Sequence, residues 1–141
     1  MTRLTKPLEP TFQPSSDVAA RVGSAETFVG DVQLERLTHN DQIATSAYRV
    51  TFAAGARTAW HTHPAGQILY VTSGNGFVAT RTGWIRRISV GDVVEIPAGV
   101  DHWHGAGPDT PMQHIAIQPD ANTRWGENVS VNDYRKMTAN G

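Results

Sequence analysis

Cysteine is absent from this chain of 141 residues. Its absence excludes disulfide bonds, iron–sulfur clusters, thiolate zinc sites and a cysteine nucleophile. Any metal ion must therefore be bound through nitrogen and oxygen ligands. An excess of charge of one sign is missing as well, because 12 basic residues balance 13 acidic ones and leave a net charge of −1. This balance provides no electrostatic surface for nucleic acid or an anionic membrane, so we predict neither as a partner.

Long apolar runs are also missing. No segment approaches the ~18 consecutive apolar residues that a membrane-spanning helix requires. The first residues, MTRLTKPLEPTFQPSSD, contain no apolar core of the kind that a secretory signal carries. We therefore expect a cytoplasmic protein, and the length fits one domain with a substantial core.

Both ends of the chain differ from its middle. Residues 1–23 are polar and contain three prolines, which favours an extended N-terminal arm. Leu8 and Phe12 could attach this arm to a sheet, including a sheet of a neighbouring subunit, or the arm could be a disordered terminus. Residues 119–141 are polar again, and a serine followed by an aspartate three residues later predicts a short C-terminal helix over about residues 131–137.

Residues 24–118 contain short apolar or alternating runs separated by turn residues, which is typical of an antiparallel β-sandwich or barrel. Turns are expected where glycine recurs, at 73–76, 82–83, 90–92 and 97–99. We therefore predict an all-β domain over residues 24–118. The expected strands are 32–37, 45–52, 57–63, 67–72, 77–80, 84–88, 93–96, 101–104 and 112–117.

Histidine is well represented, and five of the six histidines lie between residues 61 and 114. His61 and His63 are two residues apart in an expected strand, so their imidazoles project from one face and can bind one metal ion together. Gln67 follows after a turn and can add an oxygen ligand. His102 and His104 form a second pair of the same kind, with a tryptophan between them that faces the opposite side.

These two segments resemble the paired motifs of the cupin superfamily. The first motif, G-x5-H-x-H-x3,4-E-x6-G, is represented by Gly55, His61, His63, Gln67 and Gly74. The second, G-x5-P-x-G-x2-H-x3-N, is represented by Gly91, Pro97, Gly99 and His102, with Ala106 in place of the usual asparagine. The resemblance implies a single-domain cupin, an antiparallel β-barrel or jelly roll, whose metal ligands are His61, His63, Gln67 and His102.

Gln67 departs from the cupin pattern, in which this position is a glutamate. Three neutral imidazoles and a neutral amide leave the full +2 charge on a divalent ion, which stabilises anions such as alkoxide or cyanide. The same ligand set does not support oxidation to the trivalent ion. We therefore expect Lewis-acid chemistry rather than oxygen activation, with Mn(II) as the metal, then Fe(II), then Zn(II).

His114 is the candidate general base. It shares one face of an expected strand with Met112, Ala116 and Gln118, and a dication nearby would keep its imidazole neutral and basic. The alternative is a structural histidine on the outer face of the barrel. His104 could support the metal ligands, face the substrate or be structural, whereas His39 is expected at the solvated surface.

Longer stretches, at 55–67, 102–106 and 114–118, resemble the small bacterial cupins that include manganese-dependent, (R)-selective hydroxynitrile lyases. This resemblance implies reversible cleavage of a cyanohydrin into an aldehyde and cyanide, with His114 as the catalytic base. It also implies a small carbonyl compound as substrate and a homodimer or homotetramer. The residues expected around the substrate are Tyr48, Val50, Thr58, His104 and Gln118.

Three other functions remain open on the residues alone. A cupin dioxygenase would use Fe(II), Ni or Cu and would consume O2. A non-catalytic cupin would bind a metal and a small ligand without turnover. A sugar or keto-acid isomerase or decarboxylase is the third, for which Arg57 could bind a carboxylate.

Overall fold

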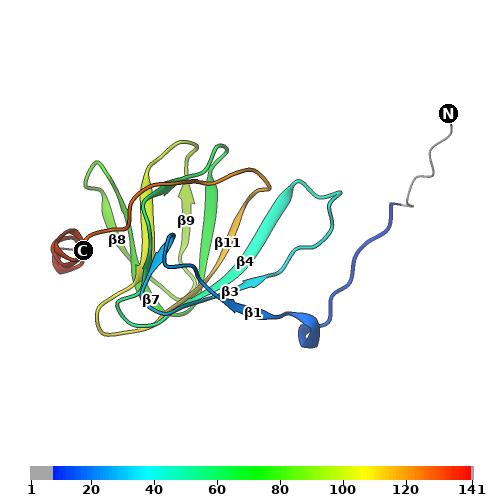
Figure 1. Cartoon of the computed structure of the whole chain (residues 1–141), viewed down its shortest axis with the longest axis horizontal. Helices are drawn as coiled ribbons and strands as arrows, with labels where there is room; N and C mark the ends of the chain where they lie inside the picture. Colours follow the sequence, from blue (N-terminus) through cyan, green and yellow to red (C-terminus); the bar gives the residue numbers. More distant parts are fainter. Residues whose placement is uncertain (1–7, 141) are drawn as a thin grey trace.

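The structure is a computed structural model that describes residues 8–140, so residues 1–7 of the expected arm lie outside it. The described strands form one curled antiparallel sheet with a single α-helix packed outside it (Figure 1). The predicted all-β architecture with a short C-terminal helix is confirmed. The elements are η1 (Ser15–Asp17), β1 (Ala20–Val22), β2 (Phe28–Val29), β3 (Val32–Arg36), β4 (Thr45–Phe52), β5 (Arg57–Thr58), β6 (His61–Thr62), β7 (Gln67–Thr80), β8 (Ile85–Ser89), β9 (Val93–Ile96), β10 (His102–Ala106), β11 (Met112–Pro119), β12 (Arg124–Trp125) and α1 (Val131–Asn140).

Alternation along the strands determines which side chains face the interior. Strand β11 pairs with β4 over its whole length and with β7 on its other side. Every second residue of β11 is buried, which places Met112, His114, Ala116 and Gln118 on the inward face. This inward face was the one predicted for the site, because a strand with a period of two presents one set of side chains to the core.

Strand β7 corrects the turn expected at 73–76. It runs without reversal for 14 residues, from Gln67 to Thr80. Its first part pairs with β11 and β9, and its second part pairs with β10 and β8. The register shifts between the pairs Gln113–Ser73 and His114–Val71, so Thr72 is the extra residue, and Gly74 next to this bulge has φ +68°. The glycine-rich segment is therefore a bulged bend that carries one strand from one half of the sheet to the other.

The expected strand at 57–63 is also corrected, because it is divided into β5 and β6. Strand β5 pairs with β2 and β10, whereas β6 pairs with β10 and β12. Between them, the backbone of Trp60 donates to Glu127 O (3.0 Å) and accepts from Gly126 N (2.7 Å). The chain thus bends at Trp60 and exchanges its outer partner from β2 to the C-terminal extension.

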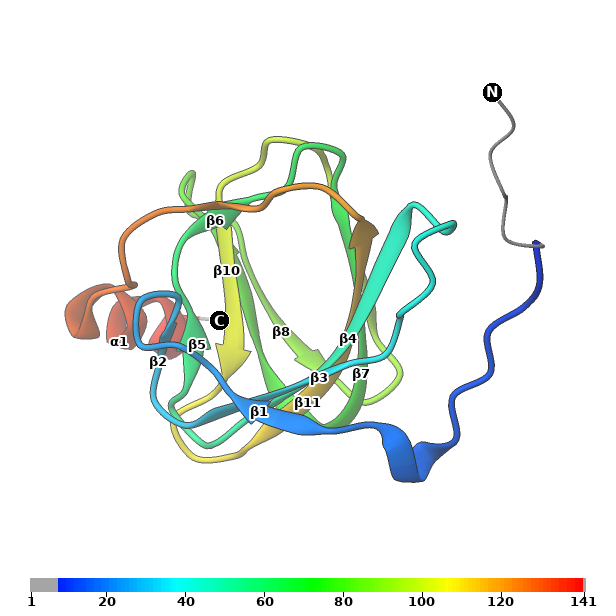
Figure 2. The ribbon, with the colours of Figure 1, turned by 45° about the vertical axis from the view of Figure 1, so that its right-hand side comes forward.

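A second apolar cluster lies between the sheet and helix α1. Trp103 is fully buried there against the ring of Tyr134 (5.6 Å between ring centres), and the Tyr134 hydroxyl donates to Ala106 O. Burying an aromatic side chain of this size contributes about 2–3 kcal/mol. Helix α1 begins as predicted, with the Ser130 hydroxyl accepting from Asp133 N (3.1 Å). It runs to Asn140, slightly beyond the expected end, and Figure 2 shows it outside β5 and β10.

The sheet extends past residues 24–118 at both ends. At the N-terminal end, β1 pairs with β3, and at the C-terminal end β12 pairs with β6. Before β1, the N-terminal segment contacts the connection between β3 and β4, where Gln13 Nε2 donates to Leu37 O (3.3 Å) and Asn40 Nδ2 donates to the Thr11 hydroxyl (2.8 Å). The side chains of Leu8 and Phe12 are exposed. Within residues 8–140, no helix is both long and apolar enough to cross a membrane.

Candidate metal centre

Three imidazoles and one amide meet inside the barrel, as the spacing of the sequence predicts. The ring centres are 5.0 Å apart for His61–His63, 4.2 Å for His61–His102 and 5.7 Å for His63–His102. Oε1 of Gln67 lies 3.1 Å from Nε2 of His102. All four side chains are buried. The antiparallel pairing of β6 with β10, which sets His61 directly opposite His102, brings the two sequence motifs together.

The Nδ1 atom of each of these three histidines has an oxygen partner in the chain. His61 Nδ1 donates to Ala59 O (2.9 Å), and His102 Nδ1 donates to Val100 O (2.8 Å). His63 Nδ1 lies 3.3 Å from the hydroxyl of Thr123. A neutral imidazole that donates from Nδ1 keeps a lone pair on Nε2. In His61 and His102, whose Nδ1 atoms face carbonyl oxygens, Nε2 is therefore an acceptor.

Two features of this group are not satisfied by hydrogen bonds within the protein. His102 Nε2 and Gln67 Oε1 are both acceptors, yet they lie 3.1 Å apart. His63 Nε2 is buried and has no hydrogen-bond partner. Facing acceptors are repulsive unless a cation lies between them, and two ligands about 2.1 Å from one ion at right angles are about 3 Å apart. The residues present thus fit a divalent cation bound by three nitrogens and one oxygen, a donor set that suits Mn, Fe, Co, Ni, Zn or Cu(II).

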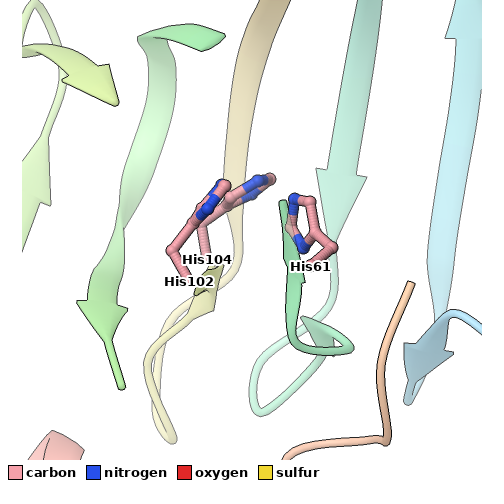
Figure 3. Close-up of side chains that lie close together, drawn as sticks. All are labelled: His61, His102 and His104. Carbon is pink, nitrogen blue, oxygen red and sulfur yellow. The ribbon is translucent and has the colours of Figure 1, made fainter. Parts of the chain in front are cut away.

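His104 and His114 form a second group beside the first. His114 Nε2 and His104 Nδ1 are 2.9 Å apart, so one ring donates to the other. The outer nitrogens, His104 Nε2 and His114 Nδ1, are buried without partners. Ring nitrogens of His61, His102 and His104 also all lie within 4.8 Å of one another, and Figure 3 shows these three side chains converging from β6 and β10. His104 therefore stands between the metal-binding group and His114.

Burial keeps these imidazoles neutral. It lowers the pKa of His63 and that of His114 from 6.5 to about 4. Burial, followed by the neighbouring His102, also places the pKa of His61 well below its ordinary value. Burial and then His114 do the same for the pKa of His104. Neutral imidazoles are the form that binds metal ions and accepts protons.

A cavity of about 300 Å³ leads to the two histidine groups. The five residues expected around the substrate all line it: Tyr48, Val50, Thr58, His104 and Gln118. His61, His63 and Gln67 line it as well, whereas His114 lies behind His104 and is fully buried. The candidate base therefore reaches the cavity through another imidazole.

Other wall residues were not singled out in the sequence. Trp125 of β12 packs against His61, with ring centres 4.7 Å apart, and Arg21 of β1 and Phe28 of β2 also line the cavity. These side chains come from segments whose sequences show no alternation or motif. Only the pairing of β12 with β6 reveals that Trp125 lies at the site.

The structure also gives the positions of Arg57, which the isomerase or decarboxylase alternative invoked, and of His39, which was expected at the surface. The Arg57 guanidinium is buried away from the cavity, where it donates to Val129 O (2.7 and 3.2 Å) and lies over the Tyr134 ring. It cannot bind a substrate carboxylate. His39 is exposed on the outside of the barrel and contacts Arg36 O, as expected for a surface histidine.

The chain is similar to known cupins in sequence. The cupin domain model matches residues 48–118. The (R)-mandelonitrile lyase of Granulicella tundricola is 43% identical over 122 residues, which cover 84% of this chain and 93% of that protein. Germin-like protein 5-1 of Oryza sativa subsp. japonica is 31% identical over 106 residues, 69% of this chain and 48% of that protein.

Solved structures show the same fold. A cupin-like protein from Thermotoga maritima superposes with a TM-score of 0.80 at 41% identity, covering 92% of this chain and 98% of that one. The polyketide cyclase RemF from Streptomyces resistomycificus reaches 0.71 at 17% identity, over 90% and 92% of the two chains, which is a likeness of fold alone. With its family model, its relatives and its paired histidine motifs in agreement, the chain belongs to the cupin family.

Proposed function

We propose that the protein is a metal-dependent lyase that reversibly cleaves a cyanohydrin into a small aldehyde and cyanide. The observation that carries this proposal is the pair of adjacent histidine groups at one cavity, one suited to a cation and one suited to a proton. The 43% identity to a bacterial (R)-mandelonitrile lyase, over most of both chains, supports the same reaction.

The first group would hold the cation through Nε2 of His61, His63 and His102 and Oε1 of Gln67. Mn(II) is the ion we propose, then Fe(II), then Zn(II). A divalent ion bound there supplies Lewis acidity toward the hydroxyl or carbonyl oxygen of the substrate. Because all four ligands are neutral, none of them cancels part of the +2 charge of the ion.

The second group would handle the proton. His104 faces the cavity and takes the hydroxyl proton of the cyanohydrin at Nε2, while its Nδ1 proton passes to Nε2 of His114. The oxygen keeps the electron pair of its O–H bond and forms the carbonyl. The carbon–carbon bond to the nitrile then breaks, and cyanide leaves with that electron pair. His114 thus serves as the base through His104, and the same atoms return the proton in the direction of synthesis.

The cavity wall suits a small aromatic or aliphatic aldehyde. Phe28, Tyr48 and Trp125 supply apolar contact, whereas Thr58 and Gln118 supply polar groups. Among the lining residues, Arg21 is the side chain that carries a formal charge at neutral pH, and no carboxylate is present. An anion such as cyanide is therefore not repelled by the wall.

The test is an assay of purified, Mn(II)-loaded protein with benzaldehyde and cyanide, with and without air. We expect formation of one enantiomer of mandelonitrile at equal rates in both atmospheres. His39→Ala serves as a matched control for loss of a histidine outside the site. Metal binding without cyanohydrin formation, together with O2 uptake on a diketone or catechol, would refute the lyase in favour of an oxygenase. Metal and ligand binding without any turnover would favour a non-catalytic cupin.

A further inference from the structure

The Gln67 side chain has two ends of nearly the same shape, and only one of them can bind a metal ion. Its Oε1 offers lone pairs, whereas its Nε2 offers two N–H donors and repels a cation. A glutamate, the usual residue at this position, has two equivalent oxygens and needs no orientation. The substitution of an amide for the carboxylate therefore requires that some neighbouring group select one orientation.

A hydrogen-bonded chain of three buried side chains on the inward face of the sheet ends at Gln67. Gln67 Nε2 donates to Gln118 Oε1 (3.1 Å), and Gln118 Nε2 donates to the Ser46 hydroxyl (2.8 Å). The Ser46 hydroxyl in turn donates to the main-chain carbonyl of Gln118 (3.5 Å). Ser46 and Gln118 are directly opposed on β4 and β11, so their positions are set by the sheet itself.

We infer that Gln118, held by Ser46, is a positioning residue that fixes the Gln67 amide with its oxygen toward the metal. This inference rests on the proposed metal centre but not on the lyase reaction. In residues 8–140, no other group accepts a hydrogen bond from Gln67 Nε2. If the Gln67 amide turned by itself, its oxygen would face the oxygen of Gln118 at about the same separation, with both groups buried.

The opposite orientation is attractive to the metal-free protein, which is why a restraint is needed. His102 Nε2 is an acceptor at 3.1 Å from Gln67, so an N–H donor would satisfy it better than Oε1 does. Turning Gln67 without conflict requires Gln118 to turn as well, and then Ser46 must redirect its proton from the main chain to Gln118. The Gln67 amide can therefore reverse only if Gln118 and Ser46 reorient with it. This coupling keeps Oε1 of Gln67 directed toward the cation site.

The experiment measures Mn(II) affinity, not turnover, by titration of the metal-free protein with EPR detection of free Mn(II). Gln118→Met keeps most of the side-chain volume but removes the acceptor, and we expect its Kd to rise about tenfold. Gln118→Glu keeps acceptors toward Gln67 and should bind Mn(II) at least as tightly as the unaltered chain. Ser46→Ala, which loosens Gln118 alone, should show a smaller rise.

The deciding comparison is made in a Gln67→Glu background. A carboxylate needs no orientation, so Gln118→Met should change the Mn(II) Kd there by less than about twofold, which makes the two substitutions strongly non-additive. An equal loss in both backgrounds would show a general distortion and overturn the inference. So would unchanged affinity of Gln118→Met in the native background. If the unaltered protein binds no Mn(II), the inference and the proposed function both fail, whereas binding without lyase activity removes only the function.

Discussion

Two groups of buried histidines lie side by side in this barrel and differ in what their Nδ1 atoms contact. In His61, His63 and His102, each Nδ1 has an oxygen partner, and for His61 and His102 this partner is a main-chain carbonyl, which leaves Nε2 as an acceptor. In the other group, the partner of His104 Nδ1 is the imidazole of His114. Distance does not separate the groups, since His104 lies as near to His61 and His102 as a ligand would. This difference indicates that the hydrogen-bond partner of Nδ1 determines the role of each histidine, either to bind the cation or to transfer the proton.

The largest expected effect follows from removing a ring of the first group. His61→Ala deletes one proposed ligand, and Mn(II) affinity should fall by at least about 100-fold, because a ligand matters more than its supporting contacts. Lyase activity should fall with it. Titration calorimetry measures the affinity, with His39→Ala as the control that leaves it unchanged. Stoichiometric Mn(II) binding by His61→Ala would remove this histidine from the site.

Removing a ring of the second group should lower kcat but leave Mn(II) binding unchanged. His114→Leu leaves the ligands intact but deprives His104 of its proton acceptor, so kcat should fall by about 100-fold, within the range known for general acid–base catalysis. The Mn(II) content should remain one ion per chain. Full activity would exclude His114 as the base. Loss of the metal would show that His114 also supports metal binding, so that the two groups do not have separate roles.

Acid should destabilise the metal-free protein through both groups. The pKa values of His63 and His114 are lowered to about 4 by burial, compared with 6.5 when they are exposed. Between these values the unfolded chain binds protons that the folded chain does not, so stability is fully present above pH 6.5 and is lost as the pH falls toward 4. Each such histidine contributes about 1.4 kcal/mol per pH unit in this window.

Urea unfolding of the metal-free protein from pH 7 to pH 4.5 measures this slope. His114→Leu should lower this slope by about one proton. A flat profile between pH 6.5 and 5 would show that the rings are not buried in neutral form.

The smallest expected effect concerns a single supporting contact in the first group. Thr123→Val removes the hydroxyl that lies 3.3 Å from His63 Nδ1, and the Mn(II) Kd should rise several-fold, at most about tenfold. Thr123→Ser keeps the hydroxyl and should restore the affinity. If serine and valine behave alike, the hydroxyl does not orient His63, and the comparison between the two groups loses one of its supports.

The inward faces of the strands could be predicted from the sequence, because residues two apart in a strand project from the same face. The sequence placed His61, His63, His102 and His114 inside the barrel, where the structure has them. It was wrong at Gly74, since glycines that permit a bulged bend look the same in sequence as glycines that permit a reversal. The interruption between β5 and β6 was likewise hidden, because it reflects a change of partner rather than a change in the strand's own residues.

The contacts that distinguish the two histidine groups could not be predicted from the sequence. Thr123 is 60 residues from His63, and Ser46 is 72 residues from Gln118. Neither contact leaves a periodic pattern, because each depends on which strands are neighbours and in what register. The relation of His114 to His104 needed the structure for the same reason.

The most direct test of the two-group account is a crystal of the protein soaked in MnCl2 and measured at the manganese absorption edge. We predict one anomalous peak per chain, bonded to Nε2 of His61, His63 and His102 and to Oε1 of Gln67, with His104 still hydrogen-bonded to His114. A peak that is coordinated by His104 in place of His63, or the absence of a peak among these residues, would contradict it.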